Sequence, residues 1–306
     1  MKAIVYEKYG TPDVLHLAEV DKPRPKKDEI LIKIYATTIT AGDVRMRSFD
    51  VPLWQWFPAR VYLGIRKPKR QILGMELAGK IEEVGEEVGL YKKGDQVFAS
   101  TTSHNFGAYA EYKCLPEEGM VAPKPKNISY NEAAAVPVGG ATALRFIKKE
   151  NIQKGQKWVI YGASGSVGSY AVQLAQYFGA EVTGICSTSN LGWVKNLGAE
   201  KVIDYTQGDF TKNLKNCDVI FDTVGRISSS QVKKALSTNG IFLSVLKSAG
   251  NEKKEDLLYL KNLIEREKIR PVIDREYTME EIPEAHKYVE KGHKKGNVVI
   301  TIANEM

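Results

Sequence analysis

One stretch of this chain, residues 157–190, limits the possible folds more than any other. It begins with the apolar, β-prone run Trp158–Tyr161 and continues through the glycine turn Gly162–Gly168. Apolar residues then recur at offsets of 4, 7, 8 and 11 from Val167, which is the spacing of one helix face. A continuous apolar run is typical of a strand buried on both faces of a parallel sheet. The stretch therefore predicts a strand, a glycine turn and a helix in direct succession.

The glycines of this turn have a chemical interpretation. Gly165 would let the backbone approach a pyrophosphate, and Gly168 would let the helix pack closely on the strand. Unpaired N–H groups at the helix start would face the anion. The full fingerprint G-x-G-x-x-G would have glycine where this chain has Ala163. An ordinary tight turn would show similar glycines, but with the strand and the helix in place we predict dinucleotide binding.

The length and composition indicate a globular protein with about two domains. The chain has 306 residues, of which 43% are hydrophobic and 26% are charged. No apolar run reaches the roughly 18 residues that span a bilayer, and Glu7 places an acid too early for a secretory signal. The three cysteines are scattered and offer neither a disulfide framework nor a Cys-x-x-Cys zinc site. We therefore predict a cytoplasmic protein without a transmembrane segment, with its cysteines buried.

Residues 1–125 carry the signals of an antiparallel β-domain, because short strand patterns alternate with turn markers. The expected strands are Ala3–Tyr6, Ile30–Tyr35, Leu77–Val84, Gln96–Ala99 and Ala108–Lys113. The C-terminal tail, with a helix near Glu280–Lys291 and a strand at Val298–Ile300, is too small to fold alone. We expect it to complete the β-domain.

The segment from Phe49 to Gly74 interrupts the strand pattern with aromatic residues and a basic run. The aromatic residues are Trp54, Trp56, Phe57 and Tyr62, and the basic run is Arg66–Arg70. A loop of this length is usually functional or packed on a neighbour, so we interpret it as a lid over a pocket. A helical hairpin that buries the rings in a subunit contact is the alternative. The net charge of +7 is otherwise scattered, and we interpret the basic run as a solvated loop, with a phosphate or polyanion contact as the alternative.

In residues 126–273 a helical stretch comes first, and from Trp158 onwards strand and helix patterns alternate. Ser129 and Glu132 predict a capping box, and Pro137–Gly140 is expected to interrupt the helix that follows. The expected strands are Trp158–Tyr161, Glu181–Ile185, Val202–Asp204, Val219–Phe221 and Ile241–Val245, and the expected helices are 166–178, 190–197, 228–236 and 253–267. Such alternation predicts right-handed βαβ crossovers and a doubly wound parallel sheet. Pro271–Ile273 is expected either to add a sixth strand or to begin the return to the first domain.

Short motifs along the whole chain carry a family resemblance. They are Gly74–Gly79, Lys93–Val97, Gly107–Tyr112, Ala133–Pro137, Thr142–Leu144, Ala163–Gly168, Leu197–Glu200, Val202–Tyr205 and Phe221–Gly225. With them the chain resembles the zinc-free quinone oxidoreductase (zeta-crystallin-like) branch of the medium-chain dehydrogenase/reductase superfamily, where Ala-x-Gly-x-x-Gly is typical. The resemblance implies an α/β fold with a GroES-like β-barrel domain, residues 1–125 with 274–306, and a Rossmann NADP-binding domain, residues 126–273. It also implies a homodimer, with the active site in the cleft between the domains.

Zinc-dependent members of that superfamily carry a catalytic Cys near the third strand and a Gly-His-Glu motif. The corresponding places in this chain are Thr40–Asp43 and Gly74–Glu76, with Met75 in the place of the His. Methionine is a poor zinc ligand and no cysteine is near. We therefore expect no metal site and no Lewis-acid route to alcohol oxidation.

The end of the second Rossmann strand distinguishes the two nicotinamide cofactors. An NAD enzyme would place Asp or Glu there to bind the ribose hydroxyls, whereas this chain reads Cys186–Asn190. A carboxylate would repel a 2′-phosphate, while hydroxyls at a helix start can donate to it, so we predict NADP as the cofactor. Tyr205 matches a family contact to that phosphate. The alternative is that Ser187 and Thr188 only cap the helix at 190.

The resemblance extends the cofactor site beyond the turn. Thr142 and the backbone around Ser244–Leu246 match family contacts to the nicotinamide end, and Val224 follows the fourth strand on the ligand-binding edge. The expected cofactor-binding residues are Thr142, Gly162, Ala163, Ser164, Gly165, Ser166, Val167, Gly168, Ser187, Thr188, Ser189, Asn190, Tyr205, Val224, Ser244, Val245 and Leu246.

The expected reaction is hydride transfer from NADPH to a small-molecule quinone or an α,β-unsaturated ketone or aldehyde. Attack at the β-carbon makes an enolate, so the site must stabilise negative charge on oxygen and admit a proton. The resemblance places Thr40, Asp43, Arg45 and Arg47 at the catalytic positions. An ion pair between Asp43 and Arg47 at four-residue spacing is the structural alternative for those two, and solvent could supply the proton.

Two other functions fit the same sequence. One is a zinc-free carbonyl or alcohol oxidoreductase. The other is a non-catalytic NADPH-binding protein that contacts nucleic acid or membrane through Arg66–Arg70, although we expect no stable nucleic-acid partner. His286 and His293 lie among lysines near the C-terminus and are expected to face solvent.

Overall fold

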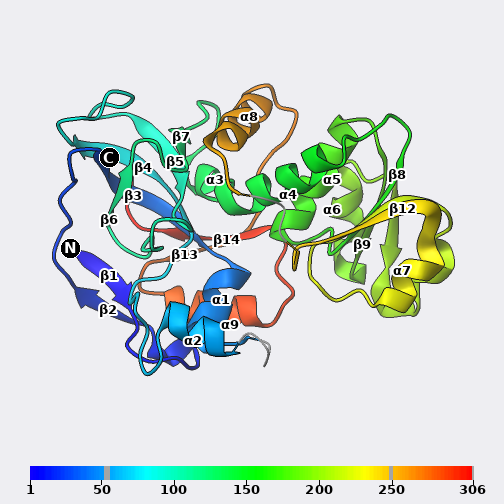
Figure 1. Ribbon diagram of the computed structural model, residues 1–306, viewed down its shortest axis with the longest axis horizontal. Coiled ribbons are helices and arrows are strands. Elements are labelled where there is room, and N and C mark those ends of the chain that lie inside the picture. The colour runs from blue at the N-terminus through cyan, green and yellow to red at the C-terminus, as the bar shows by residue number, and fades with distance from the viewer. Residues whose placement is uncertain (52–55, 248–250, 305–306) are drawn as a thin grey trace. The chain divides into compact units, whose positions relative to one another are not determined.

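The computed structural model describes residues 1–51, 56–247 and 251–304, without the side chain of Tyr62. By their packing the residues form two units (Figure 1). The barrel unit comprises Met1–Pro137, Lys253–Lys261 and Ile273–Met306, and the Rossmann unit comprises Val138–Glu252 and Asn262–Val272. The domain boundaries expected from the sequence stay a prediction.

Five parallel strands form the sheet of the Rossmann unit. They are β8 (Lys157–Tyr161), β9 (Glu181–Cys186), β10 (Lys201–Asp204), β11 (Cys217–Asp222) and β12 (Leu236–Ser244). Their order, β10-β9-β8-β11-β12, places β8, the first of them in the chain, at the centre. The chain therefore leaves β8 first to one side and then to the other, which confirms the doubly wound sheet. The change of direction puts a topological switch point between β8 and β11.

The helices of this part of the chain are α4 (Pro137–Lys149), α5 (Ser166–Tyr177), α6 (Leu191–Asn196) and α7 (Ser229–Ala235). The helix predicted after the glycine turn is confirmed as α5, but burial is not confined to the predicted apolar face, because every residue from Gly168 to Ala175 is buried. Gln173 shows why: its Nε2 donates to Arg270 O at 3.0 Å and its Oε1 accepts from Arg270 N at 2.9 Å. The helix is thus covered by neighbouring chain as well as by the sheet, and a helix covered all round is buried all round.

The barrel unit is built on one mainly antiparallel sheet. Its strands are β3 (Glu29–Ile39), β4 (Glu76–Val84), β5 (Gln96–Ser100), β6 (Tyr112–Pro116), β7 (Val121–Pro123), β13 (Ile273–Thr278) and β14 (Asn297–Thr301), and a separate ribbon pairs β1 (Lys2–Val5) with β2 (His16–Glu19). Alternate residues of β3, namely Ile30, Ile32 and Ile34, are buried in one core cluster. The period-2 pattern of β3 is therefore the one that builds this core.

The C-terminal strands belong to the same sheet as β3. β14 pairs antiparallel with β3, and β13 pairs parallel with β14. Since Ile273 begins β13, the chain returns there and adds no sixth strand to the Rossmann sheet. The expected strand Ala108–Lys113 is wrong in position, because regular pairing starts only at Tyr112 and Ala110 forms an isolated bridge with Ala3.

The capping box predicted at Ser129 is confirmed at the start of α3 (Tyr130–Ala134). Ser129 Oγ accepts from Glu132 N at 3.2 Å, and Glu132 Oε2 accepts from Ser129 N at 2.8 Å. The interruption expected at Pro137–Gly140 is wrong, because Pro137 begins α4. A proline fits the first turn of a helix, where its missing N–H would have no partner anyway.

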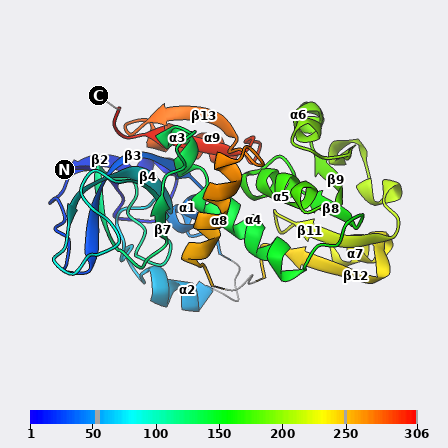
Figure 2. The same cartoon turned by 90° about the horizontal axis from the view of Figure 1, so that it is seen from above.

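The segment from Phe49 to Gly74 contains α2 (Trp56–Leu63) and follows α1 (Ala41–Ser48), as Figure 2 shows. Trp54 and the ring of Tyr62 lie outside the described part, and the lid stays a prediction.

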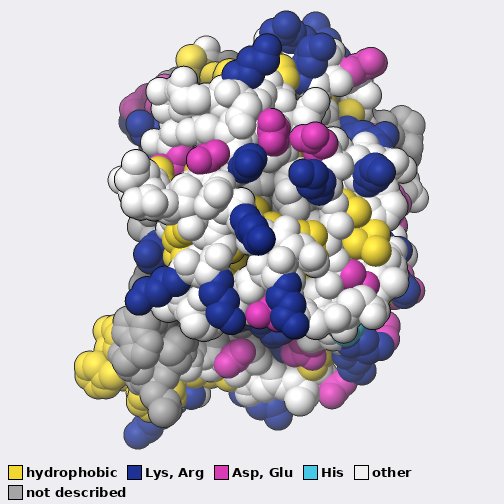
Figure 3. Space-filling model, turned by 90° about the vertical axis from the view of Figure 1, so that its right-hand side faces the viewer, with side chains coloured by type: hydrophobic (Ala, Val, Ile, Leu, Met, Phe, Trp, Pro, Cys, Tyr) yellow, Lys and Arg dark blue, Asp and Glu magenta, His cyan; other side chains and the backbone are white. Residues whose placement is uncertain are grey.

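Over the face in Figure 3, Lys and Arg side chains are spread among acidic ones. Cys186 and Cys217 are buried, whereas Cys114 is half-buried. None of the described helices, including α8 (Lys254–Glu265) and α9 (Ile282–Glu290), is long and apolar enough to cross a membrane.

Candidate cofactor and catalytic site

The glycine turn lies where β8 leads into α5. Gly162 has a φ of +77°, and a Cβ there would lie 2.3 Å from Val224 Cγ2. A Cβ at Gly168 would lie 2.1 Å from Gly162 O, so only glycine lets the helix approach the strand this closely. A Cβ at Gly165, in contrast, would meet nothing nearer than Gly162 O at 3.5 Å. The folded chain therefore requires Gly162 and Gly168, whereas a Cβ at Gly165 would make only an ordinary contact.

The start of α5 leaves backbone donors free. Gly165 precedes the helix in an extended conformation and offers no side-chain cap. Within the described ranges, no acceptor pairs with the N–H groups of Ser166, Val167 or Gly168. Such donors at the positive end of a helix dipole fit a phosphate, and the space beside Gly165 lets one approach. The turn thus fits the pyrophosphate of a dinucleotide, while Ala163 is buried beneath it and Ser164 is half-buried.

The loop after β11 is fixed against this turn by Asp222, which the sequence analysis did not single out. The buried carboxylate of Asp222 accepts hydrogen bonds from Val224 N at 3.0 Å, Gly225 N at 2.8 Å and Ile227 N at 2.9 Å. Thr223 Oγ1 donates to Tyr161 O, at the end of β8, at 2.8 Å. An Asp directly after an apolar strand and before Thr-Val-Gly was the available signal. The structure therefore brings Val224 to the glycine turn.

The end of β12 lies at the same sheet edge, because Ser244 is the register partner of Asp222. Val245 N donates to Asp222 O at 3.0 Å, and Leu246 is exposed beyond it. Thr142 is half-buried on α4, one turn after Gly139, where a Cβ would lie 2.2 Å from Ser166 Oγ. The expected residues of the nicotinamide end are thus close to the switch point or to the start of α5.

The residues after β9 form a short 3₁₀ turn, Thr188–Asn190. Ser187 makes no side-chain cap, so the alternative that Ser187 and Thr188 only cap this helix start is wrong. Ser187 Oγ instead accepts from Asn190 Nδ2 at 3.0 Å, and Ser189 is exposed. Tyr205 is also exposed at this edge, with its ring centroid 6.0 Å from that of Tyr161.

A carboxylate lies beside these hydroxyls, although the end of β9 itself has none. Asp204, at the end of β10, is the register partner of Cys186 and accepts hydrogen bonds from Thr188 Oγ1 and, at 2.7 Å, from Thr206 Oγ1. These hydrogen bonds lower the pKa of Asp204, so it is ionised at neutral pH. The sequence pattern at the end of the second strand does not reveal Asp204, because Asp204 belongs to the neighbouring parallel strand, which ends at the same edge.

In the barrel unit, Thr40 and Asp43 form a capping box at the start of α1. Asp43 Oδ2 accepts from Thr40 N at 2.9 Å and from Thr40 Oγ1 at 2.6 Å, and Asp43 Oδ1 accepts from Gly74 N at 2.9 Å. Burial raises the pKa of the Asp43 carboxyl to about 6, although the hydrogen bonds from Thr40 and Gly74 oppose the shift. Asp43 therefore joins the start of α1 to the segment that contains Met75.

The other two expected catalytic residues point elsewhere. The ion pair expected between Asp43 and Arg47 is wrong, because the fully buried Arg47 pairs through Nη2 with Glu290 of α9. Its Nε and Nη1 are buried without a partner among the described residues. Arg45 is exposed on α1. Only Thr40 and Asp43 of the four are in direct contact.

The prediction that His286 faces solvent is wrong, because this side chain is fully buried. His293 is exposed, as predicted. The Nε2 of His286 lies 3.2 Å from Tyr109 Oη, and burial lowers the pKa of His286 to about 3. The lysines nearby in the sequence concealed the pattern. On α9 the buried residues Ile282, Ala285, His286 and Val289 recur at helical spacing.

Comparison with known proteins agrees with this architecture. The alcohol dehydrogenase GroES-like domain family matches residues 26–126, and the zinc-binding dehydrogenase family matches residues 197–254 and 244–300. The chain is 33% identical over 323 residues to the 2-methylene-furan-3-one reductase of Solanum lycopersicum, covering 98% of this chain and 79% of the relative. The chain belongs to the medium-chain dehydrogenase/reductase superfamily.

Two further members of this superfamily show how closely the relationship extends. The chain is 30% identical over 321 residues to the chloroplastic NADPH-dependent alkenal/one oxidoreductase of Arabidopsis thaliana, covering 98% of this chain and 79% of that one. The quinone oxidoreductase from Coxiella burnetii superposes with a TM-score of 0.84 at 27% identity, over 99% of both chains. The resemblance to the quinone oxidoreductase branch is thereby confirmed.

The two places where zinc-dependent members of the superfamily carry ligands are in contact in this chain. Thr40 Oγ1 lies 3.2 Å from Met75 Sδ, and Thr38 Oγ1 donates to the buried Glu76. A hydroxyl and a thioether are poor zinc ligands. Among the described residues, no group of three His, Cys, Asp or Glu could hold a metal ion. The matching family's description as zinc-binding therefore does not extend to the residue types of this site.

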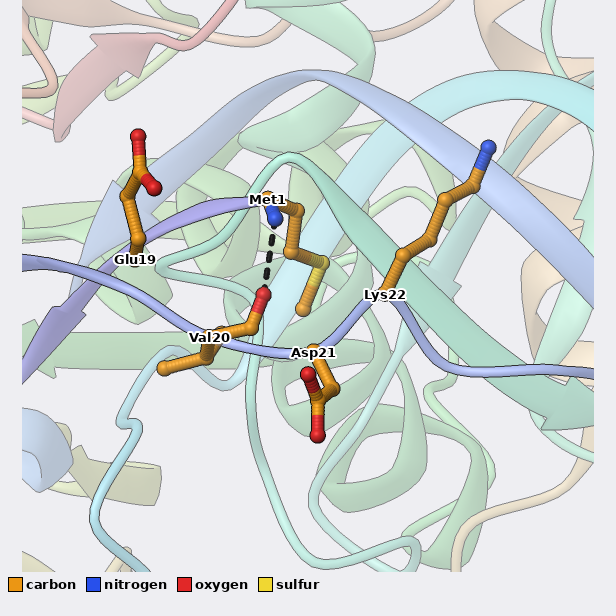
Figure 4. A pocket seen from close by; sticks show the side chains of 5 residues that line it. All are labelled: Met1, Glu19, Val20, Asp21 and Lys22. Atoms are coloured by element: carbon orange, nitrogen blue, oxygen red, sulfur yellow. Dashed lines mark hydrogen bonds between the residues drawn. The ribbon is translucent and has the colours of Figure 1, made fainter.

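A pocket beside the β1–β2 ribbon does not coincide with any predicted site (Figure 4). It is lined by Met1, Glu19, Val20, Asp21 and Lys22. The N-terminal amine donates to Val20 O at 2.7 Å, and the side chains of Glu19 and Lys22 point apart. Its few charged groups do not converge on one point, so we do not assign it a ligand.

Proposed function

We propose that this superfamily member is a zinc-independent, NADPH-dependent oxidoreductase that transfers hydride to a quinone or an α,β-unsaturated carbonyl. The observation that carries the proposal is the glycine turn at the switch point of the sheet. Among the described residues no acceptor pairs with the first three N–H groups of α5 there, and a Cβ at Gly165 would make only an ordinary contact. The relatives described as alkenal/one and quinone oxidoreductases support the choice of acceptor.

The proposed cofactor residues divide into three groups along one sheet edge. The turn Gly162–Gly168 would hold the pyrophosphate, Ser187–Asn190 with Tyr205 the adenosine end, and Thr142, Val224 and Ser244–Leu246 the nicotinamide end. When bound, NADPH supplies the hydride. The hydroxyls of Ser187 and Thr188 support NADPH, and so does the description of the Arabidopsis relative as NADPH-dependent. Asp204 acts against a 2′-phosphate, but its oxygens already accept from Thr188 and Thr206.

In the barrel unit we assign Thr40 to the acceptor site and Asp43 to positioning it. The hydroxyl of Thr40 has one proton, which it donates to Asp43 Oδ2. While Asp43 is ionised, that hydroxyl cannot donate to an enolate oxygen. Proton delivery from solvent is therefore the better-supported route at neutral pH. Arg47, held by Glu290, fits a structural role, and the exposed Arg45 has no partner that would orient it in the described ranges.

Stopped-flow measurement of NADPH oxidation with quinones, enones and aldehydes tests the proposal. We expect turnover with quinones or enones that a metal chelator does not change. Turnover with simple aldehydes alone would instead indicate a carbonyl reductase. Tight NADPH binding without turnover of any acceptor would indicate a non-catalytic NADPH-binding protein.

We also propose a cytoplasmic location and a homodimer. All three cysteines are free thiols, the state that a reducing compartment maintains, and the superfamily resemblance supports a dimer. Analytical ultracentrifugation tests the dimer, because a single species of monomer mass at all concentrations would contradict it.

A further inference from the structure

The outward side of α2 is apolar, which is unusual for a helix at the surface of its unit. Phe57 is 73% exposed and Val61, one turn later, is 48% exposed, and Pro58 is exposed beside them. On the opposite side, Leu63 packs against the core cluster of the barrel unit. The helix therefore satisfies its inward side with core contacts and leaves a second apolar side in solvent.

Contacts with Arg60 hold the helix in this orientation. The guanidinium carbon of Arg60 lies 3.8 Å from the ring centroid of Phe49 and 5.2 Å from that of Trp56. Arg60 Nη1 also donates to Ile65 O at 3.1 Å. The Arg60 guanidinium makes cation–π contacts and a hydrogen bond within this segment. Its role is therefore to hold the helix in place, and it is not counted among the cations of the outer surface.

The chain after α2 folds back onto the end of the helix. Gly64 has a φ of +128°, and a Cβ there would lie 2.0 Å from Lys67 O, so the turn depends on glycine. Lys69 Nζ donates to Val61 O at 2.7 Å. Ile65, which is 69% exposed, and the basic residues after it are thereby kept next to the apolar side of α2.

Every charged side chain in this part of the sequence is a cation. Residues 56–75 contain five Lys or Arg and no Asp or Glu. Arg66 and Lys67 are exposed, and neither has an ion-pair partner in the described ranges. An exposed apolar helix side with unpaired cations beside it is the composition that anionic lipid surfaces bind.

We propose that Trp56, Phe57, Val61, Ile65, Arg66 and Lys67, which we name the α2 surface, dock this protein reversibly on bilayers that contain anionic lipid. The aromatic and aliphatic side chains would enter the headgroup boundary, while the cations stay with the headgroups. Each cation near such a surface strengthens binding by roughly fivefold. The proposed reductase would thus associate peripherally with the membrane surface, without a segment that crosses the membrane.

Charge argues against a second copy of the chain as the partner. In a twofold contact the same patch meets itself, so the cations of one α2 surface would face those of the other. Nucleic acid would pair with Arg66 and Lys67 but gives Val61 and Ile65 no apolar partner. A lipid interface satisfies both kinds of side chain.

Co-sedimentation of the full chain with vesicles tests the proposal. One set of vesicles contains phosphatidylcholine alone, and in the other part of it is replaced by phosphatidylserine. We expect binding to the second set that weakens as salt is added, because salt screens the cations. We expect the double substitution Phe57→Ser/Val61→Ser to reduce this binding at least tenfold, and Arg66→Gln/Lys67→Gln to reduce it roughly 25-fold.

Matched controls separate this surface from general hydrophobicity and charge. Leu258→Ser removes another exposed apolar residue, and Lys212→Gln/Lys215→Gln removes two exposed cations of the Rossmann unit; both should bind vesicles like the unsubstituted chain. Thermal unfolding shows that the variants are folded. The proposal is overturned if the unsubstituted chain does not co-sediment with phosphatidylserine vesicles, or if it binds single-stranded RNA but not these vesicles. It is equally overturned if Phe57→Ser/Val61→Ser dissociates a dimer, or raises the KM of water-soluble acceptors, without affecting vesicle binding.

Discussion

Helices α1 and α5 begin with the same difficulty, because the first N–H groups of a helix have no partner within it. In α1 the chain provides one acceptor itself, because Thr40 Oγ1 accepts from Asp43 N at 3.1 Å, while the Asp43 carboxylate accepts from Thr40 N and Gly74 N. In α5 the capping position is Gly165, and the first three N–H groups are free in the described ranges. The first helix start is thus partly capped by the chain's own side chains, whereas the second has no side-chain cap.

The difference distinguishes a structural helix start from a binding one. A hydroxyl at the cap occupies the N–H of the third helical residue, and a carboxylate on that residue adds a negative charge that repels an anion, whereas glycine at the cap does neither. The start of the Thr188–Asn190 turn is intermediate between these two helix starts. A carboxylate, that of Asp204, lies there as it does at α1, but it accepts a hydrogen bond only from the Thr188 hydroxyl. Substitutions at these three helix starts therefore have different expected effects.

The largest effect is expected from Asp43→Ala in α1. The substitution removes the cap and leaves Gly74 N, a buried donor, without its acceptor. We expect it to lower the free energy of unfolding by about 4 kcal/mol, measured by urea denaturation. An effect below that of Ser129→Ala, at the exposed capping box of α3, would show that Asp43 is not structural.

The pH dependence of stability gives the next largest effect. Folding raises the pKa of Asp43 from 3.8 to about 6, so the folded chain binds this proton more tightly than the unfolded chain. The resulting contribution to stability is fully present below pH 3.8 and is lost as the pH rises through 6. The stability of the unsubstituted chain minus that of Asp43→Asn should therefore fall by about 3 kcal/mol between acid and neutral pH. The titration of His286 is common to both proteins and cancels in this difference. A constant difference would contradict the assignment.

Gly168→Ala tests the close approach of α5 to β8. Its Cβ would meet Gly162 O at 2.1 Å and two further backbone atoms within 2.9 Å, none of which can rotate away. We expect a loss of about 2 to 3 kcal/mol in the free energy of unfolding. Gly192→Ala, where a Cβ would meet nothing within 4 Å, is the control and should not destabilise the chain.

Gly165→Ala separates ligand binding from folding at the same turn. Since its Cβ has ordinary contacts and Gly165 has a φ of −82°, the fold should be retained. The methyl group would stand where the pyrophosphate is proposed to approach. We expect NADPH affinity to fall roughly tenfold or more in calorimetric titration, with an unchanged melting temperature. An unchanged NADPH affinity would show that the turn is structural and does not bind the pyrophosphate.

The smallest effect is expected at the intermediate helix start. Asp204→Asn removes the negative charge of a half-buried carboxylate next to Thr188 and Tyr205. We expect the preference for NADPH over NADH, measured as the ratio of the two kcat/KM values, to rise by roughly threefold in dilute buffer and less at high salt. Asp209→Asn removes a comparable exposed charge elsewhere and should leave this ratio unchanged. A fall in the ratio would mean that Asp204 supports the phosphate.

Most of the Rossmann unit could be predicted because its signals are local. The strand, the turn and the helix between 157 and 178 follow from apolar periodicity and glycine spacing within a short window. The capping box of α3 is equally local, since Ser129 and Glu132 lie three residues apart. In such cases the residues that interact are also the residues that form the pattern.

The errors concern partners that are far apart in the sequence. Arg47 pairs with Glu290 rather than with the nearby Asp43, and the contact spans 243 residues. His286 is buried against Tyr109, 177 residues away, although its sequence neighbours are basic. Asp204 reaches Thr188 only because β9 and β10 are adjacent parallel strands. Spacing along the chain carries no information on such pairs until the topology is known.

The pairing of β14 with β3 has a consequence for the order in which the protein is made. Residues 36–39 of β3 pair with Val298–Thr301, which are synthesised only after the whole of the Rossmann unit. The long continuous part of the Rossmann unit, Val138–Glu252, has by then been synthesised, and domains generally fold as units during synthesis. Until the final strand arrives, this stretch of β3 presents unpaired backbone groups that another strand could join. The barrel unit, whose strand β3 precedes the Rossmann unit in the chain, therefore closes only after the Rossmann unit has been synthesised, and β3 is exposed to mispairing in that interval.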